Sequence, residues 1–213
     1  MTIRVMVIDD QAMIRGALAG LLDLETDIEV VAQAANGVEA LDELARLSGE
    51  ETAPRTRPPV DVAIVDVEMP RMDGITATEA IRTRFPSVRV LVVTTFGRPG
   101  YLQRALAAGA SGFMVKDAPV EDLVDGVRTV AAGGRTIDQS LAIDALSAGA
   151  SPLTARETDV LREVEGGGTI ADIAHALTLS QGTVRNHVSS AMLKMDARTR
   201  AEAASLARAA GWL

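Results

Sequence analysis

Four apolar runs of strand length in this sequence each end in residues whose side chains can bind a ligand or a metal ion. A carboxylate at the tip of a buried strand is costly unless it is solvated, paired or bound to a cation, so its presence needs a reason. In a parallel α/β sheet, ligands bind in the crevice beyond the carboxyl ends of the strands. We therefore expect these side chains to meet at one edge of a sheet. The runs and the residues at their ends are 3–9 with Asp9 and Asp10, 60–66 with Asp66, 88–95 with Thr94, and 112–116 with Lys116.

The carboxylates at these strand ends predict a metal site. Carboxylates held close together repel one another and raise each other's pKa values, and a hard divalent cation removes that penalty. Mg²⁺ fits this site because it takes oxygen ligands in octahedral geometry. The predicted ligands are Asp9, Asp10, Asp66 and the backbone carbonyl of Glu68.

The same set of side chains suits phosphoryl transfer, in which a protein mainly positions groups and neutralises the equatorial oxygens. An aspartate can itself be the nucleophile and form an acyl phosphate. Asp66, at the centre of the predicted sheet edge, is the candidate phosphoacceptor, and Thr94 and Lys116 would hold phosphoryl oxygens. Taken singly, an aspartate after a strand is more often a cap and a lysine more often lies on the surface. The prediction therefore depends on their joint occurrence.

The segments that must position these residues alternate between two kinds. A fifth run of strand length, residues 28–34, joins the four above, and segments with helical spacing of apolar residues separate the runs. Alternation of this kind predicts βαβ units, and hence a five-stranded parallel sheet with helices on both faces. The polar, proline-rich segment 48–59 is expected to be a surface loop before the third strand.

The pattern changes after Gly134, where the alternation stops. Residues 133–150 resemble a linker with a short helix, and only helical segments follow. The chain is therefore predicted to contain an α/β domain over 1–132 and a small all-α domain over 151–213. Within the second domain, the expected helices cover 154–165, 169–177, 181–194 and 198–210.

Composition limits the class of protein. The chain has 213 residues, no cysteine and only five aromatic residues, so it has no disulfides and its cores must be aliphatic. No apolar run approaches the roughly 20 residues that cross a bilayer, so we expect a cytoplasmic protein without membrane insertion. The net charge of −8 is uneven, because the first 150 residues hold 22 acidic and 14 basic residues while the rest holds seven of each.

The pair of helices over 169–194 is typical of a helix-turn-helix, which lays its second helix in the major groove of DNA. Val184, Val188, Ala191 and Met192 have the spacing of a buried face, and this leaves polar residues, including Ser190, on the outside. Arginine favours guanine and asparagine favours adenine, while other basic residues hold phosphates. The expected contacts are Arg185, Asn186 and Ser189 with bases, and Lys194, Arg198 and Arg200 with phosphates.

The segments "VIDDQ", "VDVEMPRMDG", "VVTTF" and "AGASGFMVKD" resemble the receiver domain of two-component response regulators, over residues 3 to about 132. The resemblance implies a flavodoxin-like fold in which Asp66 accepts a phosphoryl group from a sensor histidine kinase. It also implies that Asp9 and Asp10 help bind Mg²⁺ and that Thr94 and Lys116 contact the phosphate. Phe113, three residues before the lysine, would rotate inward when Thr94 moves.

The segment "LTARETDVLREVEGGGTIADIAHALTLSQGTVRNHVSSAMLKMDARTRAEA" resembles the LuxR/NarL-type DNA-binding domain. Together the two resemblances imply a transcription factor whose phosphorylation promotes dimerisation and binding to double-stranded promoter DNA through helix 181–194. Its only catalysis would be its own phosphoryl acceptance. The stretch "TTFGRPGYLQRA" is further similar to regulators of membrane-lipid desaturation.

Two alternatives remain open on the sequence. A Mg²⁺-dependent phosphatase with an aspartate nucleophile would need a second acid for the leaving group and a substrate cap, and Glu68 is the only neighbouring acid. A regulator that keeps the fold but works without phosphate would not need the full set of strand-end residues. Turnover of a phosphate ester would favour the first, and an unmodified protein after treatment with acetyl phosphate would favour the second.

Overall fold

The computed structural model describes residues 2–49, 58–95 and 97–213, so most of the predicted loop 48–59 and Phe96 lie outside the described residues. The chain divides into two compact units. One is made of residues 1–97 and 102–143 and contains a sheet, and the other is made of residues 98–101 and 144–213 and is helical.

The sheet of the first unit is parallel throughout, with the strand order β2-β1-β3-β4-β5-β6. The predicted parallel α/β fold is confirmed, and its first five strands lie within one or two residues of the expected bounds. They are β1 (Ile3–Ile8), β2 (Ile28–Ala34), β3 (Val62–Val65), β4 (Arg89–Thr94) and β5 (Gly112–Val115).

The number of strands was predicted wrongly, because the described residues contain a sixth strand, β6 (Thr136–Ile137). It pairs in parallel with Gly112 and Phe113 of β5. Two residues are too short to give a periodic signal, and they fall in the segment predicted as a linker. The unpaired backbone groups at the outer edge of β5 make this pairing favourable once the chain returns from the helix that follows β5.

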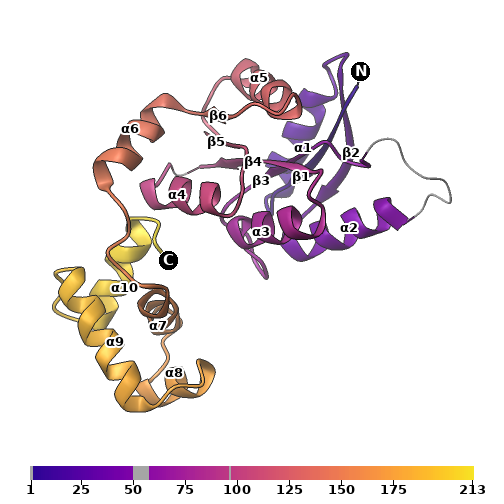
Figure 1. Ribbon diagram of the computed structural model, residues 1–213. Helices are drawn as coiled ribbons and strands as arrows, with labels where there is room; N and C mark the ends of the chain where they lie inside the picture. The colour runs from indigo at the N-terminus through magenta and orange to yellow at the C-terminus, as the bar shows by residue number, and fades with distance from the viewer. Residues whose placement is uncertain (1, 50–57, 96) are drawn as a thin grey trace. The chain divides into compact units, whose positions relative to one another are not determined.

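Helices cover both faces of this sheet (Figure 1). Side chains of α1 (Ala12–Leu22) and α5 (Val120–Ala131) share one apolar cluster with alternate residues of the strands, such as Val5 and Val7 of β1. Residues between these, such as Met6 and Ile8, are buried toward the opposite face. The other helices of the unit are α2 (Gly37–Gly49) and α3 (Gly74–Arg84), while α4 (Pro99–Ala107) and α6 (Gln139–Ala148) have residues in both units.

The second unit contains the four helices expected after residue 150. Three of them begin at threonine caps, and the first two of these form capping boxes, in which Thr154 pairs with Glu157 and Thr169 with Asp172. Ser180 caps the third helix by accepting a hydrogen bond from the Thr183 backbone N–H. The helices are α7 (Ala155–Glu165), α8 (Ile170–Ala176), α9 (Gln181–Lys194) and α10 (Arg200–Ala209).

Candidate functional site

Two of the strand-end carboxylates lie side by side because their strands are neighbours in register. Ile8 of β1 pairs with Val65 of β3, so Asp9 and Asp66 leave adjacent strands at the same level. Both are almost fully buried, with 1% and 4% of their surfaces exposed, whereas Asp10 is exposed. One carboxylate oxygen from each of Asp9, Asp10 and Asp66 lies within 4.8 Å of the others, so the three are compatible with a divalent metal ion.

Lys116 reaches this cluster from the end of β5. Its Nζ lies 2.7 Å from Oδ2 of Asp9 and 3.0 Å from Oδ2 of Asp66, with only 9% of the side chain exposed. These are close ion pairs, and within the described residues neither Asp9 Oδ2 nor Lys116 Nζ has a hydrogen bond outside this cluster. A buried carboxylate oxygen and a buried ammonium that have no hydrogen bond outside the cluster fit a site that binds a cation next to an anion.

The remaining oxygens of the two buried carboxylates are held by the backbone. Oδ1 of Asp9 accepts from the Gln11 N–H at 2.9 Å, and Oδ1 of Asp66 accepts from the Val67 N–H at 2.8 Å. Each carboxylate is therefore fixed on one side while Oδ2 faces the lysine. This arrangement presents Asp66 Oδ2 in a defined direction, as a nucleophile requires.

Burial and charge act in opposite directions on these groups. Burial raises the pKa of Asp66 above its usual value, and the nearby Lys116 offsets only part of that rise. Burial lowers the pKa of Lys116, but its pairing with Asp9 and Asp66 raises it more, so the net shift is upward. The lysine is therefore charged at neutral pH and is the local counter-charge for the carboxylates.

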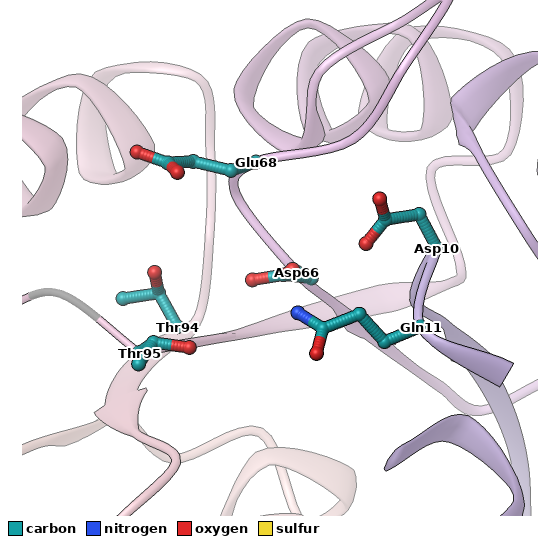
Figure 2. Close-up of a pocket in the computed structure, with 6 residues that line it drawn as sticks. All are labelled: Asp10, Gln11, Asp66, Glu68, Thr94 and Thr95. Atoms are coloured by element: carbon teal, nitrogen blue, oxygen red, sulfur yellow. The ribbon is translucent and has the colours of Figure 1, made fainter. Parts of the chain in front are cut away.

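A cavity of about 200 Å³ opens above Asp66. Asp10 and Gln11 line one side, and Glu68, Thr94 and Thr95 line the other, with Asp66 between them (Figure 2). Sequence reasoning missed Gln11 and Thr95 as lining residues, although each directly follows a predicted site residue. The cavity brings together the predicted residues Asp10, Asp66, Glu68 and Thr94.

The loop after Asp66 is shaped by "MDG", residues 72–74. Asp73 caps α3, since its Oδ1 accepts from the backbone N–H groups of Ile75 and Thr76, both at 2.9 Å. Gly74 packs directly on the Asp66 backbone, because a Cβ at this position would lie 1.8 Å from the carbonyl oxygen of Asp66. Glycine therefore lets α3 begin beside the candidate phosphoacceptor.

Two further residues predicted for this region are deeply buried. Thr94, the last residue of β4, is 1% exposed, and Phe113 in β5 is fully buried. Phe113 pairs with Val92 of β4 across the sheet. Its predicted inward rotation together with Thr94 stays a prediction.

In the helical unit, α9 has one buried and one exposed face. Val184, Val188 and Ala191 are buried in the apolar core of the unit, and Met192 packs against that core, as predicted. The predicted base-reading residues are all exposed, and they are Arg185, Asn186 and Ser189. Beyond the helix, Arg198 is exposed, and Arg200 is partly buried in the first turn of α10.

Ser190 and Lys194 have a structural partner that the sequence did not indicate. Both donate at 2.6 Å to Glu157 of α7, which is buried. Ser190 is partly buried, so its predicted outward position is wrong. Lys194 keeps 32% of its side chain exposed, and its three donors leave room for a further contact.

Two stretches of the chain, one holding the acidic pocket and one holding the helix pair, match the models of known protein families. Residues 5–128 match the model of the response regulator receiver domain, and residues 151–207 match that of the bacterial regulatory proteins of the luxR family. The chain belongs to the LuxR-type response regulators. This response regulator is a transcription factor that joins a receiver domain to a LuxR-type DNA-binding domain.

Relatives along the whole chain support the same classification. The regulator is 41% identical to the transcriptional regulatory protein YvfU of Bacillus subtilis (strain 168), covering 99% of this chain and 100% of YvfU. It is 38% identical to the transcriptional regulatory protein DesR of the same organism, covering 99% and 98%. Similarity to regulators of membrane-lipid desaturation stays a prediction.

A solved structure of similar sequence matches the chain over its whole length. The response regulator ChrA of a heme-sensing two-component system is 32% identical, with a TM-score of 0.55, covering 100% of this chain and 99% of ChrA. In the described part of the regulator, every helix falls short of the length and apolar character that crossing a bilayer requires.

Proposed function

We propose that Asp66 accepts a phosphoryl group from a sensor histidine kinase, and that this modification promotes dimerisation and promoter binding. The observation that carries the proposal is that one carboxylate oxygen from each of Asp9, Asp10 and Asp66 lies within 4.8 Å of the others, with the Lys116 ammonium 3.0 Å from Asp66. No other cluster of three such carboxylates was found in the described residues.

Mg²⁺ is the proposed cofactor, because the donor set consists of hard carboxylate oxygen atoms within 4.8 Å of one another, and the buried Asp9 Oδ2 has no hydrogen bond outside this cluster. Asp9, Asp10, Asp66 and the Glu68 backbone carbonyl would hold it. When bound, it supplies positive charge that stabilises the oxygens of the transferred phosphoryl group. The Lys116 ammonium, 3.0 Å from Oδ2 of Asp66, would supply the same kind of stabilisation.

The transfer step uses the fixed orientation of Asp66. Its Oδ2 attacks phosphorus, a new P–O bond forms, and the P–N bond to the kinase imidazole breaks, leaving a neutral imidazole after protonation. Thr94 and Lys116 then contact phosphoryl oxygens that the unmodified protein lacks. Contacts made only in the phosphorylated state are what a population shift between two conformations requires, and Phe113 beside β4 would move with Thr94.

The DNA-binding unit would read promoter DNA through α9. Arg185, Asn186 and Ser189 form its exposed face and would contact base edges. Lys194, Arg198 and Arg200 would contact phosphates. Because residues 151–213 carry no net charge, one copy has little non-specific attraction to DNA, and two copies on paired half-sites would bind much more tightly.

Binding to DNA after phosphorylation tests this proposal. Full-length protein is treated with acetyl phosphate and Mg²⁺ and titrated onto a duplex that the treated protein selected from a random pool. We expect at least about a tenfold gain in affinity over the untreated protein, together with a dimer in solution. Asp66→Asn should show neither change. Equal binding by treated and untreated protein would contradict the proposal.

A further inference from the structure

Glu157 is a buried acid that the phosphorylation chemistry does not use. It lies in the first turn of α7 and is 3% exposed. A carboxylate this deeply buried is destabilising unless it is paired and fully hydrogen-bonded. Its partners therefore show what the side chain does for the domain.

The partners of Glu157 come from two helices. Oε2 accepts from the Thr154 N–H at 2.7 Å, which closes the capping box of α7. The same oxygen accepts from Lys194 Nζ at 2.6 Å, and Oε1 accepts from Ser190 Oγ at 2.6 Å. One carboxylate thus ties the start of α7 to the second half of α9.

The two contacts on α9 restrain the helix in a specific way. Ser190 and Lys194 are four residues apart, so they lie on the same side of α9 in successive turns. Two directional bonds one turn apart oppose both rotation of the helix about its axis and sliding along it. The buried Val184, Val188 and Ala191 make apolar contacts, which are less directional and tolerate small rotations better.

The other two acids that cap helices in this unit behave differently. Asp172 accepts from Thr169, and Glu202 accepts from the backbone N–H of Arg198 just before its own helix. Both acids are exposed. In the part of the chain that the structure describes, only the capping acid of α7 also bonds to α9.

We propose that Glu157 is a positioning residue for DNA reading. By holding Ser190 and Lys194, it sets the rotation of α9 and hence the direction in which the exposed face of that helix points. The inference rests on the proposed function, in which this face enters the major groove. Its consequence is that Glu157 supports discrimination between sequences rather than affinity for DNA in general.

Contacts to bases depend on side-chain direction more strongly than contacts to phosphates do. Bidentate bonds from Arg185 or Asn186 to a base need a defined side-chain direction, so a small rotation of α9 weakens them. Phosphate contacts are longer-ranged, depend on salt and carry no sequence information directly. Loss of the Glu157 contacts should therefore affect a selected duplex more than a shuffled one.

The test uses the full-length phosphorylated protein and two duplexes, one selected by the wild type from a random pool and one with the same bases shuffled. Glu157→Gln should weaken binding to the selected duplex about tenfold or more and to the shuffled duplex less than about threefold. Lys194→Met should weaken binding to both duplexes and reduce the preference for the selected one by a similar factor. Lys194→Arg keeps the ion pair and should keep the discrimination. Asp172→Asn and Glu202→Gln are the matched controls and should leave both affinities unchanged.

The salt dependence separates positioning from a phosphate contact. Because Lys194 is also a proposed phosphate contact, Lys194→Met should lower the slope of affinity against salt concentration by about one as well as reducing discrimination. Glu157→Gln keeps the lysine charge and should leave the slope unchanged. A smaller slope in Lys194→Met with discrimination intact would make Lys194 a phosphate contact alone and overturn the inference. Equal losses on both duplexes, or the same loss of discrimination in the controls, would also overturn it.

Folding of each variant is checked by the fluorescence of Trp212, the single tryptophan of the chain. If Glu157→Gln does not fold, Ser190→Ala gives the same test, because it removes one hydrogen bond and keeps the ion pair. About a threefold loss of discrimination is then expected, and none would contradict the inference. A wild-type protein that prefers no duplex would instead contradict the proposed function itself.

Discussion

The Lys116 ammonium lies 3.0 Å from Oδ2 of Asp66, although the two residues follow strands that β4 separates. The long lysine side chain spans the intervening strand and arrives among carboxylates that are almost fully buried. It neutralises part of their charge in the unmodified protein. After phosphorylation the same ammonium is within reach of phosphoryl oxygens, so one side chain serves both states.

Removal of this ammonium should destabilise the receiver domain in the absence of metal. Lys116→Met leaves the buried Asp9 and Asp66 without their counter-charge, so the free energy of unfolding should fall by roughly 3 kcal/mol. Urea unfolding followed by circular dichroism in EDTA measures this change. Asp117→Asn, at an exposed neighbour, is the control and should change little. An unchanged unfolding midpoint in Lys116→Met would show that the ion pairs contribute no net stability.

The effect of Mg²⁺ on the stability of the receiver domain should depend on Asp10. A cation that binds only the folded protein stabilises it by about 2.7 kcal/mol at a concentration one hundred times its Kd. Mg²⁺ should therefore raise the melting temperature of the wild type, and EDTA should reverse the rise. Asp10 is exposed, so Asp10→Asn should fold normally in EDTA but lose most of the Mg²⁺-dependent rise. An equal rise in both proteins would place the metal elsewhere.

Two glycines should respond oppositely to replacement by alanine. At Gly74 the added Cβ would lie 1.8 Å from the Asp66 carbonyl oxygen, so Gly74→Ala should cost about 3 kcal/mol and slow phosphorylation. At Gly20 in α1 nothing lies within 4 Å, so Gly20→Ala should stabilise the helix by about 0.5–1 kcal/mol. Urea unfolding of both variants measures this. Similar effects at the two sites would contradict the close approach at Gly74.

Much of the receiver domain was predictable because local signals and tertiary structure agree there. The β-branched runs gave strands whose carboxyl ends align, and the order of strands in a parallel sheet then brought Asp9, Asp66 and Lys116 together. The sixth strand was missed since two residues carry no period, and its formation depends on the free edge of β5. Residues that line the cavity, such as Gln11, belong to no pattern that the sequence alone displays.

In the helical unit, the periodicity of apolar residues does not predict the position of every side chain. The helices and their threonine and serine caps follow from local sequence, and so does the buried face of α9. Helical spacing nevertheless predicted that Ser190 lies on the outer face of α9. Its position is decided by a partner 33 residues away, Glu157, whose local signature indicates only a capping box. A hydrogen bond between two helices that are distant in sequence produces no recognisable pattern in the sequence of either helix.

The pairing of Glu157 predicts a pH dependence for the stability of the DNA-binding domain. Burial raises the pKa of Glu157, but hydrogen bonds from Lys194, Ser190 and Thr154 lower it more, to about 2 from a usual 4.5. Because the folded-state pKa is depressed, the stabilisation is fully present above about pH 4.5 and is lost as the pH falls toward 2.

Unfolding in urea between pH 6 and pH 2, followed by Trp212 fluorescence, measures this loss. In the wild type it should reach about 3 kcal/mol across the window, on top of the contributions of other acids. Glu157→Gln has no charge to titrate and should show a flatter profile than the wild type. Parallel profiles for wild type and Glu157→Gln would contradict the shifted pKa.

The covalent state of Asp66 is the most direct test of the proposed chemistry. Full-length protein is incubated with acetyl phosphate and Mg²⁺, and its intact mass is measured before the acyl phosphate hydrolyses. We predict the addition of one phosphoryl group to the wild type and of none to Asp66→Asn, with no addition to the wild type in EDTA. An unmodified wild-type protein, or an equally modified Asp66→Asn variant, would contradict the assignment of Asp66 as the phosphoacceptor.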